Sequence, residues 1–192
     1  MKVFGGGSQV SLHFWSIMAL LKIAHYPEKV LLEVGKPIGE EEFNEKLKQT
    51  VEDMFETMYD AGGVGLAAQQ VFRSQRLFVM DVAKEDGSAN PIAFINPEII
   101  SVEGEQVGDE GCLSFPGLYQ KVQREMRVIV QAQDILGEKF ELDLNDLAAR
   151  CVLHETDHCD GIVFIDRMTR LKREMAKRSI KRLIKTGEWE TV

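Results

Sequence analysis

Residues 154–161 read HETDHCDG and form the end of a helix that the surrounding sequence predicts from about residue 145 to residue 160. His154 and His158 are four residues apart, so on a helix both rings face the same way and can reach one metal ion. Glu155 lies about 100° around the helix axis, a position that suits a general base acting on metal-bound water better than a ligand. The stretch supplies only two ligands and one acid, and the same pattern also occurs by chance on ordinary helices.

The apolar residues of this helix predict which face is buried. One stripe steps along the helix by three, four, three and four residues, and it consists of Leu144, Leu147, Cys151, His154 and His158. Two imidazoles that are buried side by side need a shared polar partner, and a divalent metal would be one. We expect Asp143 or Asn145 to cap the start of the helix and Gly161 to follow its end.

Apolar residues at helical spacing predict two further helices. One covers residues 41–60 and stops at Gly62 and Gly63, and a basic one runs from about Thr169 to Lys185, before Gly187. Strands are predicted at 77–82, 92–96, 98–103, 127–133 and 138–142, the last two joined as a hairpin at Gly137. The fold class is therefore α+β, with mixed or antiparallel strands around the central histidine-bearing helix, an N-terminal amphipathic helix and a C-terminal helix.

The composition of the 192 residues, 44% hydrophobic and 28% charged, is typical of one globular domain. We expect residues 18–192 to form that domain, and residues 1–17, which include GGGS, to be a leader or extension outside the fold. Three cysteines without regular spacing argue against a disulfide framework and for a reducing compartment, the cytoplasm. No apolar run reaches about 18 residues, so we expect no membrane-spanning helix and no membrane partner.

Charge is unevenly distributed along the chain. The net charge is −8, which argues against a general nucleic-acid binder, and we expect no DNA partner. Residues 167–192 nevertheless include nine Lys or Arg and three Asp or Glu, a net of +6, so the other residues carry −14. A basic tail on an acidic body indicates either a docking site for something anionic or a solvated helix face.

A third metal ligand could lie downstream or upstream of the two histidines. A metzincin protease would have a histidine where this chain has Phe164, and Glu174 lies in a basic helix that is predicted to be exposed. The upstream stretch DEGCLSFPG, residues 109–117, offers Cys112 beside a glycine that lets the backbone approach closely. A thiolate binds Zn²⁺ or Fe²⁺ strongly, although a lone cysteine is more often a small buried apolar residue. We assign that packing role to the two other cysteines, Cys151 and Cys159.

The stretch GGVGLAAQQ, residues 62–70, alternates glycines with small apolar residues. Such a sequence can form a flat, extended backbone that accepts a peptide as an added strand. The simpler interpretation is a helix terminator followed by a loop. The stretch is not a dinucleotide-binding motif, because no predicted strand precedes it and the pattern G-x-G-x-x-G is absent.

These three stretches, taken in this order, resemble the motifs of the peptide deformylase family. The family patterns G-φ-G-φ-A-A-x-Q, E-G-C-L-S and Q-H-E-x-D-H correspond here to residues 63–70, 110–114 and 153–158. Two weaker matches are INPEI at 95–99 and GIVFIDR at 161–167, and the resemblance covers about residues 18–190. Three motifs in the right order are far more specific than one.

The resemblance implies a metal-dependent hydrolase that removes the N-formyl group from the initiator methionine of new bacterial-type polypeptides. It implies that the metal ligands are Cys112, His154 and His158, and that Glu155 is the catalytic acid and base. The side chain of Gln70 and the backbone N–H of Leu113 would be the oxyanion donors. It also implies one divalent metal ion, with Fe²⁺ the usual native metal and Zn²⁺, Ni²⁺ or Co²⁺ able to occupy the site.

The resemblance further implies where the substrate and a partner bind. Formyl-methionyl nascent peptides would pair with the backbone near Gly63–Gly65 and Leu113–Phe115. The methionine side chain would enter an apolar pocket lined by Gly63, Val64, Gly65, Leu147, the stem of Arg150, and Cys151. Arg124 would pair with Glu110 and hold the cysteine loop. In related bacterial deformylases a basic C-terminal helix docks on the ribosome, which implies the same role for residues 169–187.

Three positions depart from the family pattern: Leu153 stands where Gln is usual, Cys159 where Leu is usual and Phe72 where Gly is common. None of these three differences removes a ligand or a catalytic group. They do leave undetermined which residues hydrogen-bond to the metal ligands. Two other functions stay open at this point. One is a metalloendopeptidase of the HExxH type with Glu174 as a ligand. The other is a non-catalytic metal- or peptide-binding module, whose fourth coordination position would be closed.

Overall fold

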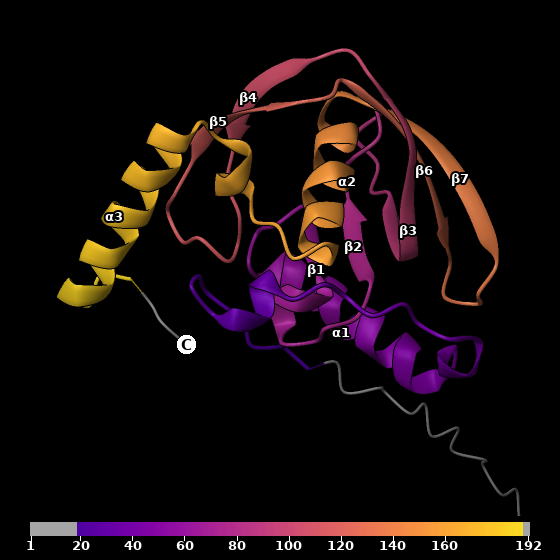
Figure 1. The fold of residues 1–192 in the computed structure, drawn as a ribbon. Helices are drawn as coiled ribbons and strands as arrows, with labels where there is room; N and C mark the ends of the chain where they lie inside the picture. The colour runs from indigo at the N-terminus through magenta and orange to yellow at the C-terminus, as the bar shows by residue number, and fades with distance from the viewer. Residues whose placement is uncertain (1–18, 190–192) are drawn as a thin grey trace, which may run out of the picture.

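Helix α2 (Asp146–Cys159) lies at the centre of the protein in a computed structural model that describes residues 19–189 (Figure 1). Ten of its fourteen residues are buried, and they include His154, Glu155 and His158. A helix that other elements enclose on most sides has buried residues around its whole circumference and not only along one stripe. This central position is what the α+β prediction expected for the histidine-bearing helix.

Two antiparallel sheets surround α2. The larger one has five strands in the order β1, β2, β3, β6 and β7, with bounds Gly65–Ala67, Leu77–Asp81, Pro91–Glu103, Arg127–Gln133 and Lys139–Asn145. The smaller sheet pairs β4 (Gln106–Glu110) with β5 (Gln120–Arg124). The predicted α+β class is confirmed, and every pairing between the named strands is antiparallel rather than mixed.

The two strands predicted at 92–96 and 98–103 are one continuous strand, β3. Its pairing with β6 shifts register between Ile95 and Glu98, and Asn96 adopts a positive φ of 52°. The side chain of Asn96 compensates for the interrupted ladder, because its Oδ1 accepts from the N–H of Ile38 and its Nδ2 donates to the Ile38 carbonyl and to Gln133. The interruption between the two predicted strands is therefore a bulge within β3 and not a turn between separate strands.

The predicted hairpin is present as β6 and β7, with Gly137 in the turn at a φ of 82°. β7 is longer than predicted and continues directly into α2, so Asn145 occupies the N-cap position without a side-chain capping bond. Asp143 caps nothing, because it lies in β7 and pairs with Arg127. The sequence prediction missed β4 and β5, whose residues are mostly polar and lack a clear apolar alternation.

The two outer helices are close to their predicted positions. α1 (Glu45–Asp60) starts four residues later than predicted, because Asn44 caps it by accepting from the N–H groups of Lys46 and Leu47. α3 (Arg170–Thr186) ends at Gly187, which has a φ of 72°. Figure 1 shows α3 at one side of the molecule, beyond β5, and α1 beneath the larger sheet.

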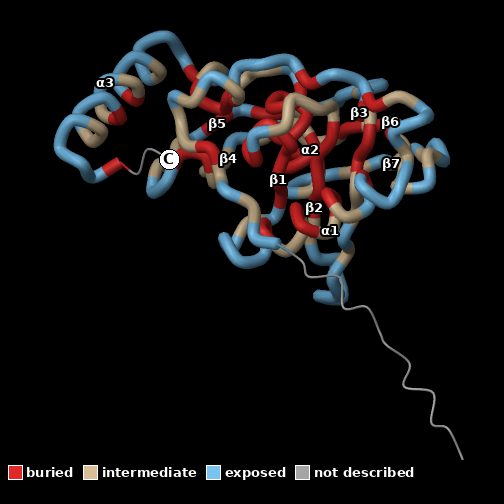
Figure 2. The backbone as a smooth tube through the Cα atoms, turned by 90° about the horizontal axis from the view of Figure 1, so that it is seen from below, coloured by how far each residue is buried: buried red, intermediate tan, exposed pale blue. Residues whose placement is uncertain are grey.

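The core consists of three apolar clusters. One lies between α1 and the strands β1 and β2, and a second lies between α2 and the larger sheet, where Phe78 stacks on Phe94 with ring centroids 4.5 Å apart. The third cluster joins the inner face of α3 to Phe115 and Phe164. Figure 2 shows the buried backbone concentrated around α2, β1 and β2, whereas α3 is largely exposed.

The predicted N-terminal leader or extension, residues 1–17, lies outside the described residues. Within residues 19–189, no helix has both the length and the apolar character that crossing a bilayer would require.

Candidate metal centre

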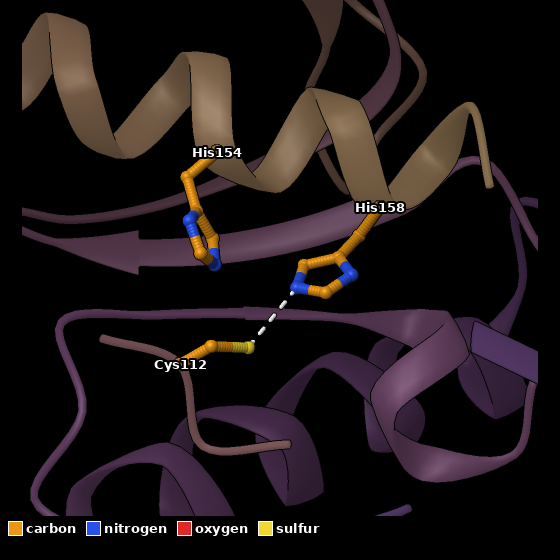
Figure 3. Close-up of side chains that lie close together, drawn as sticks. All are labelled: Cys112, His154 and His158. Carbon is orange, nitrogen blue, oxygen red and sulfur yellow. Dashed lines mark hydrogen bonds between the residues drawn. The ribbon is translucent and has the colours of Figure 1, made fainter. Parts of the chain in front are cut away.

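Cys112, His154 and His158 come together beside α2 (Figure 3). Their ligand atoms all lie within 4.8 Å of one another, and Cys112 Sγ is 3.3 Å from His158 Nε2. Figure 3 shows both imidazoles reaching down from the same face of the helix toward the cysteine, which follows β4. One thiolate and two imidazoles that converge in this way fit a divalent ion such as Zn²⁺ or Fe²⁺.

The other candidate ligands do not reach this centre. Phe164 packs its ring against His154, with centroids 6.1 Å apart, and Glu174 is an exposed residue of α3. Cys151 and Cys159 are buried free cysteines, and burial raises the pKa of the Cys159 thiol to about 12. A thiol that stays protonated in an apolar environment is a packing residue, as the sequence predicted.

Glu110 fixes the orientation of His154. His154 Nδ1 lies 2.7 Å from Glu110 Oε1, so the ring donates its Nδ1–H to the carboxylate and keeps the Nε2 lone pair for an ion. Burial alone would raise the pKa of Glu110, but the hydrogen bonds and positive charges of His154 and Arg124 outweigh it and hold that pKa far below its usual range. Glu110 is therefore ionised whenever the protein is folded at neutral pH.

Two arginines hold Glu110 in place. Arg124 donates to Oε1 and Oε2 at 2.7 and 3.1 Å, which is the pair that the resemblance implied, and Arg150 donates to Oε2 at 2.8 Å. Arg124 also bridges to Asp157 on α2 at 2.5 Å, and Arg167 donates to the same carboxylate. The bonds of Arg150 and Asp157 could not be predicted, because nothing local in the sequence indicates a partner so far along the chain.

The backbone of Ala67 orients the side chain of Gln70. The N–H of Ala67 donates to Gln70 Oε1 at 2.8 Å, so the amide nitrogen points the other way. That nitrogen lies 3.4 Å from Cys112 Sγ and 3.2 Å from Ser114 Oγ. A side-chain N–H donor is thus directed at the centre, next to the loop that carries Leu113.

Glu155 lies in the same centre and is 4% exposed. Among the described residues its Oε2 has no hydrogen-bond partner, and burial raises its pKa to about 7. β1 makes room for it, because a Cβ on Gly65 would lie 2.4 Å from Glu155 Oε1. A carboxyl group with this pKa can both accept and donate a proton near neutral pH.

A pocket of about 590 Å³ opens beside the three ligands. It is lined by the six residues predicted to form the substrate pocket, namely Gly63, Val64, Gly65, Leu147, Arg150 and Cys151, and also by Gln70, Leu113 and Glu155. Other lining residues, such as Ile23, His25 and Tyr119, were not predicted from the sequence. These residues belong to loops, where no periodic pattern marks a functional side chain.

One sequence expectation about this pocket was wrong. Leu147 was assigned to a buried stripe, but it is 54% exposed, and Val64 on the opposing segment is 46% exposed. The first turn of α2 borders the pocket, so Leu147 is open to it, whereas Cys151, His154 and His158 farther along the stripe are buried. The predicted apolar wall is present, but its outer part lies at the pocket mouth.

Within residues 19–189, β1 is the terminal strand of the larger sheet and pairs with β2 alone. Its segment borders the pocket through Gly63, Val64 and Gly65. An unpaired strand edge beside a pocket can accept an extended peptide through backbone hydrogen bonds. This geometry fits the prediction that the glycine-rich stretch is a peptide-binding backbone, although it also contains the helix terminator of the simpler interpretation.

Two departures from the family pattern have local explanations. Phe72 adopts a left-handed conformation, with a φ of 59°, at the end of the short 3-10 turn Ala68–Val71. This is a conformation that glycine reaches more easily, which is why a glycine suits the position. Leu153 is half-buried and packs against the apolar cluster between α2 and the larger sheet.

Comparisons with known proteins show which family this chain resembles over most of its length. The sequence pattern of the family described as polypeptide deformylase matches residues 20–174. The peptide deformylase of Chromobacterium violaceum is 49% identical over 165 residues, which cover 86% of this chain and 96% of that protein. The peptide deformylase of Acidobacterium capsulatum is 45% identical and is matched over its full length by 90% of this chain.

Solved structures show the same fold. A crystal structure of a peptide deformylase from Legionella pneumophila superposes with a TM-score of 0.79 at 41% identity, covering 90% of this chain and 99% of that one. A class I type b peptide deformylase from Acinetobacter baumannii, bound to Met-Ala-Ser, gives a TM-score of 0.74 at 33% identity. That match covers 79% of this chain and all of the other.

Proposed function

This chain belongs to the polypeptide deformylase family, and from that premise we propose how its residues carry out the family's reaction. The protein is a hydrolase that removes the N-formyl group from the formyl-methionine of newly made polypeptides. The observation that supports the residue assignments best is the convergence of Cys112, His154 and His158 beside Glu155 and an open pocket.

Cys112, His154 and His158 would hold the single catalytic metal ion of the family. Three protein ligands leave further coordination positions for chemistry, which distinguishes a catalytic site from a closed structural one. When bound, the ion would supply Lewis acidity, lowering the pKa of water and polarising the formyl carbonyl. We propose Fe²⁺ as the native metal, which the family resemblance implies, with Zn²⁺, Ni²⁺ or Co²⁺ able to occupy the site in a purified sample. Thiolate and imidazole ligands suit transition-metal ions of this kind.

Glu155 is the proposed proton carrier. It takes a proton from the water that attacks the formyl carbon and delivers it to the departing amine. Its pKa of about 7 suits both transfers, because neither protonation state is strongly favoured near neutral pH. The pocket beside it leaves space for the formyl group next to the carboxyl.

Gln70 and Leu113 are the proposed oxyanion donors. The amide nitrogen of Gln70 is already directed at the centre by the bond from Ala67 to its oxygen. The backbone N–H of Leu113 follows Cys112 directly in the chain, so it lies on the same loop. One such donor typically stabilises the transition state by about 2.7–4 kcal/mol.

The substrate would bind as an extended peptide along the free edge of β1, with the methionine side chain in the pocket. The exposed apolar surface of Val64 and Leu147 at the pocket mouth would contact that side chain. The Met-Ala-Ser complex of the Acinetobacter baumannii relative supports a methionine-first peptide as the ligand class.

The function is tested by formate release from a formyl-Met tripeptide, using anaerobically prepared enzyme whose metal content has been measured. Formate release without cleavage of internal peptide bonds is the expected result. Internal cleavage would instead indicate the metalloendopeptidase, which the exposed position of Glu174 disfavours. Metal binding without either reaction would indicate the non-catalytic module.

We further propose that α3 docks on the ribosome and that the reaction takes place in the cytoplasm. Six basic residues of α3 are exposed: Arg170, Lys172, Arg178, Lys181, Arg182 and Lys185. Binding to ribosomal RNA through these charges would weaken steeply as the salt concentration rises. Replacing four of them by glutamate should abolish co-sedimentation with ribosomes and leave formate release from a free tripeptide unchanged. Unchanged co-sedimentation would refute the docking.

A further inference from the structure

The chain folds back onto the body after α3, and Trp189 anchors it there. Trp189 is 4% exposed, and its Nε1–H donates to the carbonyl oxygen of Tyr26 at 2.7 Å. Its ring meets that of Phe115 edge to face, with centroids 6.3 Å apart and planes at 79°. A residue near the C-terminus therefore contacts both the N-terminal segment and the loop that follows Cys112.

The segments that Trp189 contacts also hold the cysteine loop directly. The N–H of Tyr26 donates to the carbonyl of Ser114 at 2.9 Å, and the Tyr26 ring stacks on Phe115 with centroids 4.9 Å apart. The N–H of Phe115 in turn donates to the carbonyl of Cys112 at 2.8 Å. The loop between β4 and β5 thus rests on Tyr26 and Trp189 rather than on a sheet.

This contact belongs to an apolar cluster behind the metal centre. Ala176, Ile180 and Trp189 line it from α3 and the residues that follow, and Phe115 and Phe164 line it from the body. Cys112 packs against this cluster. The ring of Phe164 lies 5.0 Å from that of Phe115 and 6.1 Å from that of His154. Two of the three proposed ligands, Cys112 and His154, therefore lie against the same apolar cluster to which Trp189 belongs.

We propose that Trp189 is a positioning residue for the loop Cys112–Leu118, so that α3 is part of the catalytic unit as well as a docking surface. This inference rests on the proposed roles of Cys112 and Leu113. The loop carries both of these residues and part of the pocket wall, Phe115–Gly117. Catalysis is sensitive to such support, since a displacement of about 1 Å at a reacting group can cost on the order of 100-fold in rate.

The first test compares variants of the full chain in formate release and in the rate of metal loss to a chelator. Trp189→Ala should lower kcat at least fivefold, change KM less than kcat, and speed metal loss. Trp189→Phe keeps a ring against Phe115 and should recover most of both properties. Met175→Ala, which removes an exposed side chain of α3, is the matched control and should behave as wild type.

The second test uses Trp189 as its own reporter. The chain has two tryptophans, so Trp15→Phe leaves Trp189 as the sole source of indole fluorescence. Adding the product-like peptide Met-Ala-Ser should shift the Trp189 emission, because peptide in the pocket contacts the loop that packs on Trp189. A merely structural tryptophan outside the site would not respond.

The outcomes separate this inference from the proposed function. If the wild type releases no formate, the proposed function fails, whereas metal loss and fluorescence still decide the role of Trp189. A folded Trp189→Ala protein with wild-type kcat and wild-type metal loss would overturn the inference. If that variant does not fold, the fluorescence decides: an emission unaffected by saturating Met-Ala-Ser overturns the inference, and a shift supports it.

Discussion

Glu110 is the side chain on which most of the centre's order depends. It accepts from His154, Arg124 and Arg150 while it is 5% exposed. A buried carboxylate is costly unless it is paired, and here three donors share it. The same residue sets which nitrogen of His154 is available to an ion, so stability and metal binding depend on one carboxylate.

The pKa of Glu110 predicts a loss of stability in acid. Its folded-state pKa lies below the ordinary value of 4.5, so its contribution is present above about pH 4.5 and is lost as the pH falls toward the folded-state value. Urea unfolding of the metal-free wild type between pH 7 and pH 3 should show this decline. Glu110→Gln should be destabilised by about 3–5 kcal/mol at pH 7 and show a weaker decline.

Asp143→Asn is the matched control for that experiment, because Asp143 also pairs with an arginine but at an exposed site. Its substitution should change neither the stability at pH 7 nor the acid dependence appreciably. Equal acid dependence in the wild type and Glu110→Gln would show that Glu110 does not carry the effect.

Glu155 gives the second prediction at the residue scale. Glu155→Ala should retain one metal ion per chain and lose activity by about 10²–10⁴-fold, since its proposed role is proton transfer and not ligation. Metal analysis and formate release on the same preparation check both parts. Activity close to that of the wild type would contradict the proposed role.

At the scale of elements, the packing of β1 against α2 determines where the carboxyl group of Glu155 lies. Gly65 on β1 faces α2 so closely that a Cβ there would be 2.4 Å from Glu155 Oε1 and 2.8 Å from Cys151 Sγ. Both values are shorter than any ordinary contact, so a larger residue must displace the carboxyl group or separate the two elements. In the sequence, Gly65 resembles a loop residue. In the structure, a glycine is required at this position because β1 and α2 pack so closely there.

Gly65→Ala should therefore lower kcat at least tenfold and leave the metal content unchanged, because Glu155 moves while the three ligands stay in place. Steady-state formate release and metal analysis provide the measurement. Gly39→Ala is the control, since the nearest neighbours of its Cβ would be the carboxyl atoms of the exposed, flexible Glu41. If Gly65→Ala and Gly39→Ala had the same kcat, the close contact would have no catalytic importance.

At the scale of the whole molecule, the metal centre joins segments that are distant in sequence. Cys112 and His158 are 46 residues apart, and the cluster behind them extends to Trp189. An ion that binds only the folded chain stabilises it in proportion to the logarithm of its concentration over its Kd. Removing the ion should therefore weaken the molecule as a whole and not only one loop.

Chelation should lower the Tm of the wild type measurably, and adding back Zn²⁺ or Co²⁺ should restore it. Cys112→Ala should lose the metal on purification and show a Tm that chelator does not change. Differential scanning calorimetry with metal analysis checks both statements. A Tm of Cys112→Ala that still responds to chelator would show that another residue completes the site.

The sequence by itself determined the positions of α1, α2, α3 and the hairpin, because helical and strand periodicity reflect contacts between residues near in the chain. The motif resemblance also supplied the residues that converge at the centre. Only the tertiary structure decided which residues support them, such as Arg150, Asp157 and Trp189, and that Leu147 is exposed rather than part of a buried stripe. The physical reason is that burial and long-range hydrogen bonds depend on the path of the whole chain, which no local pattern records.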